Sequence, residues 1–219
     1  VLDAGCGKGR YAAIVKQHFP TAEVHAVDVS AEMLRHVPAG IDARVSTIQD
    51  LPYPNASFDL VFCVEALEHV PNPQAAIAEM TRVLKPAGCL VVIDKNLARQ
   101  GALQIETWER WFDVAQLTAE LERHGLIARA DFISYEGRAP DGLFVAWKGR
   151  KSTAARGAEA SVNFYRTDYF SESNRIRVEA CRRWDQAWIQ AQLRQQDEAH
   201  PQPYADERFE NRVGMQLIQ

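Results

Sequence analysis

The sequence predicts an α/β fold in which strands and helices alternate and form a mostly parallel sheet. Short apolar runs alternate along the chain with segments whose apolar residues recur at helical spacing, and this alternation is typical of a parallel sheet. The run Phe58–Val64 is nearly continuous in apolar residues, as expected of a strand that is buried on both faces. With 219 residues, 47% of them hydrophobic, the chain can form one substantial core.

The first expected unit is a strand, a glycine-rich turn, a helix, a second strand and an acid. The chain begins VLDAGCGKGR, in which Gly5, Gly7 and Gly9 follow a short apolar run. Glycine tolerates backbone angles that clash for other residues and lets a ligand approach the main chain closely. YAAIVKQHF has helical spacing, Pro20 ends it, and the apolar stretch EVHAVDVS reaches Asp28. This order is the usual setting of a nucleotide-binding loop, in which the acid can accept hydrogen bonds from ribose hydroxyls.

Two classes of ligand fit this glycine loop. A dinucleotide site has the pattern Gly-x-Gly-x-x-Gly, but counting from Gly5 the sixth position is Arg10 and the third glycine is Gly9. This spacing disfavours a nicotinamide dinucleotide. The stretch resembles instead motif I of the class I S-adenosylmethionine (SAM) methyltransferases, Asp-x-Gly-x-Gly-x-Gly, which Asp3, Gly5, Gly7 and Gly9 match position by position. The other interpretation is a tight strand-to-helix turn without a ligand.

The rest of the domain continues the alternation of strands and helices. DARVSTIQDLPYP offers a short strand and a loop, and Asn72 with Pro73 can start a helix. The stretch KPAG ends that helix, and a buried strand is expected over Cys89–Ile93. We expect a further helix over Phe112–His124, followed by a hairpin formed by ARADFISYEG and LFVAWKG.

The stretches LPYPNASFDLV, EALEHV and RVLKPAGCLVV extend the resemblance to about Val1–Lys151. They are typical of the type 11 methyltransferase domain, a large branch of the class I SAM-dependent methyltransferases that acts on small molecules. The resemblance implies a Rossmann-like, seven-stranded, mostly parallel sheet with an antiparallel last strand. It also implies SAM as the cofactor and methyl transfer as the activity, with oxygen as the expected acceptor atom.

The resemblance further implies which residues contact the methionine and ribose parts of SAM. The backbone of Gly5, Cys6 and Gly7 would lie against the methionine part. Asp3 would hold the loop or bond the amino group of SAM through a water molecule. Asp28 would bind the ribose hydroxyls, and the alternative for this residue is a surface acid in a turn.

The same correspondence places three segments around the adenine and the methyl group. Val29 and Met33 would pack on the adenine ring. Asp50 would accept a hydrogen bond from the adenine amino group, unless it only caps its own loop, and its neighbours in the site would be Gln49 and Leu51. Tyr53 follows in the stretch DLPY, and we expect it in a loop on the adenine side.

The catalytic candidates follow the fourth strand. Val64 and Glu65 would lie near the transferred methyl group, at the end of the strand, where open α/β sheets bind their ligands. His69 is the candidate general base for a hydroxyl acceptor, because histidine titrates near neutral pH. The alternative is a histidine that only shapes its loop. Glu65 and Glu68 are weaker candidates for the base, and no cluster of metal ligands is expected.

Composition limits the other classes of function. The net charge is −4, so no basic excess points to nucleic acid. No apolar run is long enough to span a bilayer and no signal peptide is visible, so we expect a cytoplasmic protein. Because the chain begins inside an expected strand, we expect a truncated or processed N-terminus. Scattered cysteines without a Cys-x-x-Cys pair suggest reduced thiols, and these are Cys6, Cys63, Cys89 and Cys181.

The chain divides into three parts: a SAM-binding domain over 1–151, a polar linker over 152–161 and a helical or irregular extension over 162–219. We expect a helix in the extension that docks on the domain, on a second copy of the chain in a homo-oligomer, or on a substrate or partner. Arginines concentrate in the same segment, and this favours an anionic acceptor. The apolar stripe of the expected helix consists of Ile176, Ala180, Trp184, Ala187, Trp188 and Ala191.

These observations predict SAM-dependent methyl transfer to a small molecule, a glycan or a lipid precursor. One alternative is a nicotinamide-dependent oxidoreductase, which Arg10 and the stretch RVLKPAGCLVV disfavour. Another alternative is a non-catalytic partner subunit that keeps the SAM fold. The intact glycine loop and Asp28 argue against decay of the SAM site, but they do not speak for the acceptor site.

Overall fold

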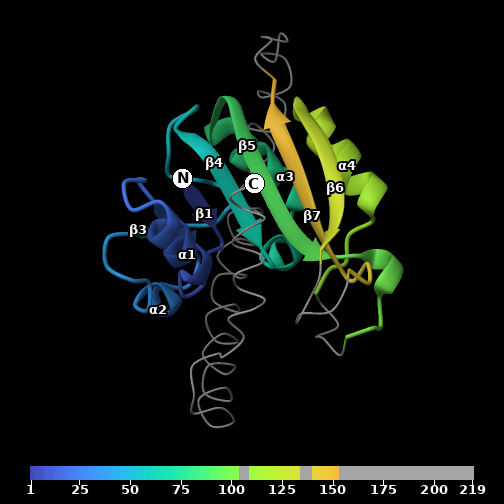
Figure 1. Cartoon of the computed structure of the whole chain (residues 1–219), viewed down its shortest axis with the longest axis horizontal. Helices are drawn as coiled ribbons and strands as arrows, with labels where there is room; N and C mark the ends of the chain where they lie inside the picture. Colours follow the sequence, from blue (N-terminus) through green and yellow to red (C-terminus); the bar gives the residue numbers. More distant parts are fainter. Residues whose placement is uncertain (104–108, 134–139, 153–219) are drawn as a thin grey trace, which may run out of the picture.

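The computed structural model of the chain describes residues 1–103, 109–133 and 140–152, which form one sheet with helices on both faces (Figure 1). The sheet has seven strands in the order β3-β2-β1-β4-β5-β7-β6. The strands are β1 (Leu2–Ala4), β2 (His25–Asp28), β3 (Asp42–Val45), β4 (Phe58–Val64), β5 (Leu84–Lys95), β6 (Leu126–Ile133) and β7 (Phe144–Lys151). The helices are α1 (Arg10–His18), α2 (Ala31–Leu34), α3 (Pro73–Val83) and α4 (Val114–Arg123), with the short 3₁₀ helices η1 (Leu67–His69) and η2 (Leu97–Arg99).

The pairing of the strands confirms the predicted sheet. Strands β1 to β5 pair in parallel, and β7 is antiparallel to both of its neighbours, β5 and β6. In parallel strands the C-terminal ends lie at one edge of the sheet. We call this side, where the loops after Ala4, Asp28, Val64 and Lys95 begin, the C-terminal edge. The opposite side, where β2 to β5 begin, is the N-terminal edge.

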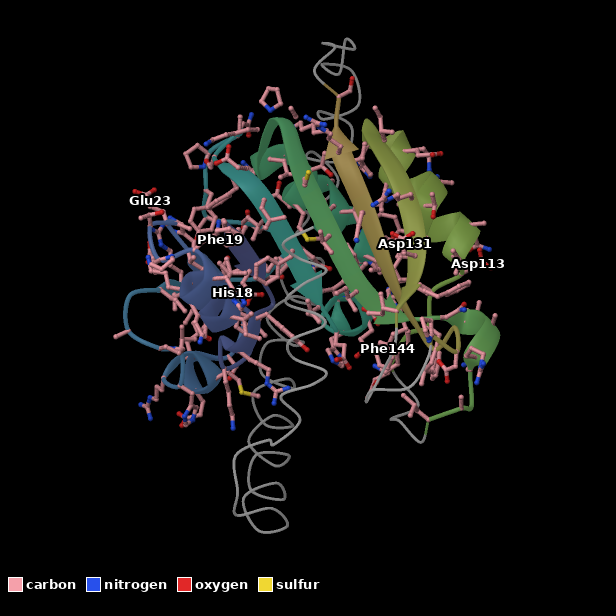
Figure 2. The ribbon with its side chains drawn as sticks, viewed as in Figure 1. His18, Phe19, Glu23, Asp113, Asp131 and Phe144 are labelled. Atoms are coloured by element: carbon pink, nitrogen blue, oxygen red, sulfur yellow. The ribbon has the colours of Figure 1, made fainter. Side chains whose placement is uncertain are left out.

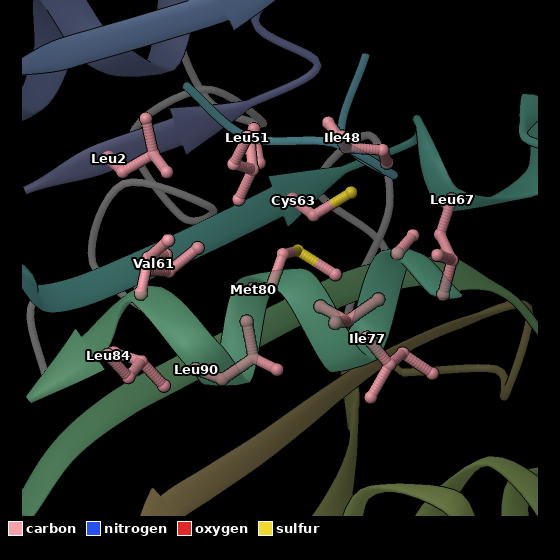
Figure 3. Close-up of a cluster of buried hydrophobic side chains, with 14 of the residues drawn as sticks. Leu2, Ile48, Leu51, Val61, Cys63, Leu67, Ile77, Met80, Leu84 and Leu90 are labelled. Carbon is pink, nitrogen blue, oxygen red and sulfur yellow. The ribbon is translucent and has the colours of Figure 1, made fainter. Parts of the chain in front are cut away.

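The continuous apolar run of β4 is explained by cores on both faces of the sheet. Val61 and Cys63 face a core that α3 and α4 cover, and Phe62 and Val64 face a second core to which α1 contributes. Figure 3 shows Met80 of α3 packed beside Cys63 of β4 in the first core. Because both faces are buried, alternation of polar and apolar residues is absent from this strand.

Local capping chemistry sets the helix ends that the sequence predicted. The side chain of Asn72 accepts a hydrogen bond from the N–H of Ala75, and Pro73 occupies the first turn of α3. Asp113, labelled in Figure 2, caps α4 by accepting from the N–H of Gln116 at 2.9 Å. Helix α4 therefore begins at Val114, two residues inside the predicted range.

The start of β5 differs from the prediction. The strand begins at Leu84 and not at Cys89, because a register shift against β4 accommodates the stretch KPAG inside the strand. Ala87 takes a positive φ of 64° within this irregular part. Cys89 itself is exposed, so the expectation of a buried strand holds only from Leu90 onward.

The expected linker over 152–161 and the extension over 162–219 lie outside the described residues, except for Ser152. Cys181 also lies outside them, whereas Cys6, Cys63 and Cys89 are free thiols. Among the described residues, none of the helices has the length and hydropathy needed to traverse a lipid bilayer.

Candidate functional site

The glycine loop between β1 and α1 occupies the C-terminal edge of the sheet. Gly5, Gly7 and Gly9 have φ values of 83°, 53° and 77°, in the left-handed region that favours glycine. The N–H groups of Gly5 and Cys6 both donate to the carbonyl oxygen of Val27, each at 2.9 Å. The loop is therefore fastened to the end of β2, and Gly9 caps the start of α1.

Gly5 has a second reason to be a glycine. A Cβ atom at Gly5 would lie 2.5 Å from the Cβ of Ala66, in the loop after β4. A Cβ at Gly7 would meet no atom within 4 Å. The loop thus approaches the end of β4 at Gly5 and faces open space at Gly7. Its backbone is therefore accessible to a ligand at Gly7.

Asp3 holds the first helix to the first strand. Its buried carboxylate accepts a hydrogen bond from the N–H of Ala12 at 3.1 Å, in the first turn of α1. Burial raises the pKa of Asp3 well above its ordinary value, the bond from Ala12 opposes that rise, and the charge of Asp28 adds to it. This geometry corresponds to the first of the two roles expected for Asp3, holding the loop.

Asp28 connects two loops at the end of β2. Its Oδ2 atom accepts from the N–H of Gly7 at 2.8 Å, and its Oδ1 atom accepts from the N–H of Ser30 at 2.9 Å. Burial raises the pKa of the carboxyl, and these two hydrogen bonds oppose the rise. Each carboxylate oxygen has a second lone pair that could accept from a hydroxyl group. The arrangement fits a ribose-binding acid.

The residues expected around the adenine come from two elements beyond β2 and β3. Val29 and Met33 are half-buried, and Met33 lies in α2, which Ser30 caps by accepting from its N–H at 3.2 Å. Asp50 is exposed. Gln49 is buried, and its Oε1 atom accepts from the N–H of Asn72 at 2.7 Å. In this structure the Gln49 side chain therefore ties the loop after β3 to the start of α3.

The expectation that Tyr53 lies on the adenine side is wrong. Tyr53 packs edge-on against His25 and Phe58, with ring centroids 5.5 and 4.8 Å away. Both partners begin strands and so lie at the N-terminal edge. The reason is that the loop after β3 must return across the sheet to start β4, and Tyr53 belongs to its returning half.

Sequence reasoning did not identify the residues that hold this returning loop. Arg82 of α3 donates to the carbonyl oxygen of Leu51 at 3.1 Å and to that of Tyr53 at 2.8 Å. Its partner Glu79 accepts from the N–H of Leu51 at 2.9 Å and pairs with Arg82 at 2.7 Å. The signal was the position of Glu79 and Arg82 three residues apart on one helix face, beside a loop rich in unpaired backbone groups.

The end of β4 brings the predicted catalytic candidates together. Glu65 has an unusual positive φ of 48°, and its N–H donates to the carbonyl oxygen of Ile93 at 2.8 Å. Glu68 and His69 follow in η1. The Oε1 atom of Glu68 lies 3.3 Å from the Nε2 atom of His69, whose side chain is 37% exposed while that of Glu68 is 3% exposed.

Sequence reasoning missed a buried cation in this region, the ammonium group of Lys95. Lys95, at the end of β5, is 5% exposed, and its ammonium pairs with Glu68. The same Nζ atom lies 3.0 Å from Oε2 of Glu109. Burial lowers the pKa of Lys95, but Glu68 and other acids raise it more, so the pKa lies above its ordinary value. The signal in the sequence was a charged pair, Asp94 and Lys95, that directly follows a run of buried apolar residues.

Asp94 fixes the backbone on both sides of this ion pair. Its fully buried carboxylate accepts from the N–H of Glu68 at 3.2 Å and from the N–H of Lys95 at 2.8 Å. Burial raises the pKa of Asp94 well above its ordinary value, and the charge of Glu68 adds to the rise. Asp94 thus joins η1 to the end of β5.

The pKa of His69 depends on its burial and on the charged groups around it. Burial lowers the pKa of His69 below its ordinary value, and Lys95 lowers it further, whereas Glu68, Glu109 and Asp28 raise it. The result is an imidazole that is mainly neutral at neutral pH and able to accept a proton. In residues 1–103, 109–133 and 140–152, no group of three or more acids, histidines or cysteines is arranged to hold a metal ion.

The comparisons with known proteins agree with this geometry. A family model described as a methyltransferase domain, the type 11 branch, matches residues 2–92. Residues 2–92 are therefore similar to a methyltransferase domain, and the match supports a class I SAM-dependent methyltransferase. The cofactor of this family is SAM, and the Gly5–Gly9 loop with Asp28 fits it, because the open backbone at Gly7 and the carboxylate lie side by side.

Two curated relatives share sequence with this methyltransferase domain. The malonyl-[acyl-carrier protein] O-methyltransferase of Hahella chejuensis is 38% identical over 119 residues, covering 52% of this chain and 41% of that protein. The ubiquinone biosynthesis O-methyltransferase of Xanthomonas oryzae pv. oryzae is 36% identical over 104 residues, covering 44% of this chain and 43% of that protein. The matched part therefore spans less than half the length of these relatives.

The solved structures show the fold of the methyltransferase domain. The [4+2]-cyclase SpnF has a TM-score of 0.60 at 22% identity, covering 70% of this chain and 74% of that chain. A SAM-dependent methyltransferase from Thermotoga maritima has a TM-score of 0.56 at 24% identity, covering 69% of this chain and 81% of its own. Because proteins with differently named activities share this fold, the activity has to be argued from the site.

Proposed function

We propose that this protein transfers a methyl group from SAM to an oxygen atom of a small-molecule acceptor. The observation that carries the proposal is the juxtaposition of the SAM loop with a histidine base. Asp28 and His69 are close enough for each charge to act on the other, although they come from the ends of β2 and β4. This juxtaposition supports the proposal that the same edge of the sheet holds the cofactor and the proton acceptor.

The chain's own residues divide the work between binding and proton transfer. The backbone of Gly5, Cys6 and Gly7 would bind the methionine part of the cofactor and the carboxylate of Asp28 the ribose, while Asp3 would hold the loop in place. On the adenine side the contacts would come from Val29, Met33, Gln49, Asp50 and Leu51. Gly9 would shape the loop by starting α1, and Val64 and Glu65 would line the place where the methyl group is transferred.

SAM supplies an activated methyl group, because its sulfonium leaves as the neutral thioether S-adenosylhomocysteine when the new oxygen–carbon bond forms. His69 would take the proton of the acceptor hydroxyl as that bond forms. Glu68 and Glu109 would stabilise the resulting imidazolium. The larger task of the protein is alignment, since the nucleophile must approach in line with the bond that breaks.

The acceptor class is proposed to be a small molecule, a glycan or a lipid precursor. Relatives support oxygen as the acceptor atom, because two are named O-methyltransferases of malonyl-[acyl-carrier protein] and of ubiquinone biosynthesis. A third is named a 2-methyl-6-phytyl-1,4-hydroquinone methyltransferase, which supports an acceptor with a lipid-like part. A cytoplasmic location, an anionic acceptor and a homo-oligomer belong to the proposal too. The last two are supported by the arginines and tryptophans of residues 162–219.

Two measurements test the proposal. Isothermal titration of the full chain should show binding of SAM and S-adenosylhomocysteine and no binding of NAD. Incubation with isotope-labelled SAM and a bacterial small-molecule extract, followed by mass spectrometry, should show a labelled product. Binding of NAD in place of SAM would support an oxidoreductase, and binding of SAM without any labelled product would support a non-catalytic partner subunit.

A matched pair of histidine variants tests the role of the base. His69→Ala should lower turnover by about 10²–10⁴-fold, which is the usual contribution of a general base, and leave SAM affinity within about twofold. His18→Ala, at the exposed end of α1 (Figure 2), should leave both unchanged. Normal turnover of His69→Ala would reduce His69 to a residue that shapes its loop.

A further inference from the structure

A chain of buried charges runs from the end of β5 to His69. Lys95 is 5% exposed and contacts Glu68, which is 3% exposed, while Glu109 approaches Lys95 to 3.0 Å from the other side. Glu68 in turn lies 3.3 Å from Nε2 of His69. Of these four side chains that of His69 is the most exposed, at 37%, so it is the one best placed to contact a ligand.

Stability by itself does not explain this arrangement. Burying two opposite charges costs desolvation energy that their attraction barely repays, and apolar side chains of similar size often serve folding as well or better. The surrounding β5 residues, Val91 to Ile93, are apolar and buried, so apolar side chains in place of Lys95 and its acidic partners together would continue the core. Asp94 also holds the backbone N–H groups of Glu68 and Lys95, which keeps the two side chains in register.

We propose that Lys95 is a positioning residue of the methyl-transfer site, whose buried ammonium pairs with Glu68 and offsets its negative charge beside His69, so that the ion pair sets the protonation of the His69 base. The inference rests on the proposed function, because it assigns the groups that control the proposed base. Because Lys95 is buried and paired with Glu68, its effect on the acceptor would pass through His69.

The charged groups that face His69 act in opposite directions. Glu68 of η1, Glu109 from the segment before α4, and Asp28 at the end of β2 favour the protonated imidazole, whereas Lys95 of β5 disfavours it. Glu65 and Asp94 face Lys95 and reach His69 less directly. Removing the lysine and removing the glutamate should therefore move the titration of His69 in opposite directions, and general damage to the fold would not produce that result.

The test is an NMR titration of the full chain with isotope-labelled histidine, and the His69 signal is assigned with the His69→Gln variant. Glu68→Gln should move the midpoint of the His69 titration to lower pH, because a neighbouring negative charge is lost. Lys95→Met should move the midpoint to higher pH, because Glu68 and Glu109 then have no buried cation to offset them. Lys95→Arg, which keeps the charge, should return the midpoint toward that of the unaltered protein.

Lys85→Met is the matched control, since Lys85 lies at the other end of β5 and pairs with the exposed Asp59 at 2.8 Å. This control should leave the His69 midpoint unchanged. The proposal is overturned if neither Glu68→Gln nor Lys95→Met moves the midpoint, or if both move it in the same direction. If Lys95→Met does not fold, as judged by circular dichroism, the direction of the Glu68→Gln shift decides.

The titration needs neither SAM nor the acceptor, so its outcome is separate from that of the proposed function. Where the acceptor is known, the acidic limb of the pH–rate profile should move in the same direction as the midpoint in each variant. The predicted shifts, to lower pH in Glu68→Gln and to higher pH in Lys95→Met, could occur in a protein that transfers no methyl group. That result would overturn the proposed function and leave the coupling of Lys95, Glu68 and His69 intact.

Discussion

The pKa values of carboxyl groups at the two edges of the sheet are shifted in opposite directions. At the N-terminal edge, Asp42 pairs with Arg44 at 2.6 Å and Asp59 pairs with Lys85 at 2.8 Å, all of them in contact with solvent. The hydrogen bond from each cationic partner lowers the pKa of Asp42 and of Asp59 below the ordinary value. These pairs are ordinary surface ion pairs with small individual contributions to stability.

At the C-terminal edge the carboxyl pKa values are raised. Burial raises the pKa of Asp3, Asp28, Glu65 and Asp94 above their ordinary values, and backbone hydrogen bonds or Lys95 offset this only in part. Ionisation of these carboxyl groups therefore costs more free energy in the folded protein than in water. Functional sites are where proteins accept such costs, because the groups must be in place before a ligand arrives. Both edges belong to the same sheet, so this difference supports the proposal that the C-terminal edge is the functional one.

The largest expected effect comes from a pair of single variants, each of which removes a lysine from one edge. Lys95→Met leaves Glu68 and Glu109 buried without their cation and should lower the free energy of unfolding by about 3–5 kcal/mol. Lys85→Met breaks an exposed pair and should cost about 0.2–1 kcal/mol. Urea unfolding at neutral pH measures both values. Equal losses in the two variants would contradict the distinction between the edges.

A second test adds a methyl group at a left-handed glycine on each edge. Gly5→Ala and Gly40→Ala both place alanine at positive φ, 83° and 89°, at a cost of about 1–2 kcal/mol. Only Gly5→Ala also brings a Cβ to 2.5 Å from Ala66, and such overpacking adds about 1–3 kcal/mol. Thermal unfolding should therefore show a larger loss for Gly5→Ala, and a loss no larger than that of Gly40→Ala would mean that the loops yield easily.

The third test concerns SAM affinity. Asp28→Ala should weaken binding of SAM and S-adenosylhomocysteine by about 1.5–3 kcal/mol, because charge-assisted hydrogen bonds to the ribose hydroxyls are lost. The N–H groups of Gly7 and Ser30 lose their acceptor in the same variant, which loosens the site. Asp59→Ala, on the N-terminal edge, should bind normally in isothermal titration. Unchanged affinity of Asp28→Ala would refute the ribose assignment.

The smallest expected effects are changes in melting temperature of opposite sign in two carboxyl variants, and both fade as pH falls. A carboxyl whose folded-state pKa is raised stabilises the fold below its unfolded pKa, and this contribution is lost as pH rises through the folded pKa. Asp3→Asn keeps an acceptor for Ala12 and should raise the melting temperature at neutral pH, with a gain that shrinks as pH falls.

Asp59→Asn should do the opposite, because the pKa of Asp59 is lowered in the folded state. It should lower the melting temperature at neutral pH, and this deficit should disappear as pH falls through the folded pKa. Melting curves from about pH 4 to about pH 8 cover the window in which carboxyl groups titrate. Shifts of the same sign in the two variants would show that burial at Asp3 is not the controlling factor.

The sequence by itself determined the elements whose causes are local. The run Phe58–Val64 predicted β4 with the bounds that the structure has, because a strand buried on both faces needs apolar residues at nearly every position. Asn72 and Pro73 predicted the start of α3, since capping involves only neighbouring residues. The three glycines predicted the loop after β1, because left-handed backbone angles are a property of single residues.

Tertiary structure alone decided which side chains meet. Lys95, Glu68 and Glu109 are far apart in the sequence, and they meet because β5 lies beside β4 and the segment before α4 crosses its end. Tyr53 was misplaced because the path of its loop depends on where β4 begins. The burial that shifts the pKa of a carboxyl, and the partner that offsets it, depend on groups brought together by the whole sheet, and no local pattern records them.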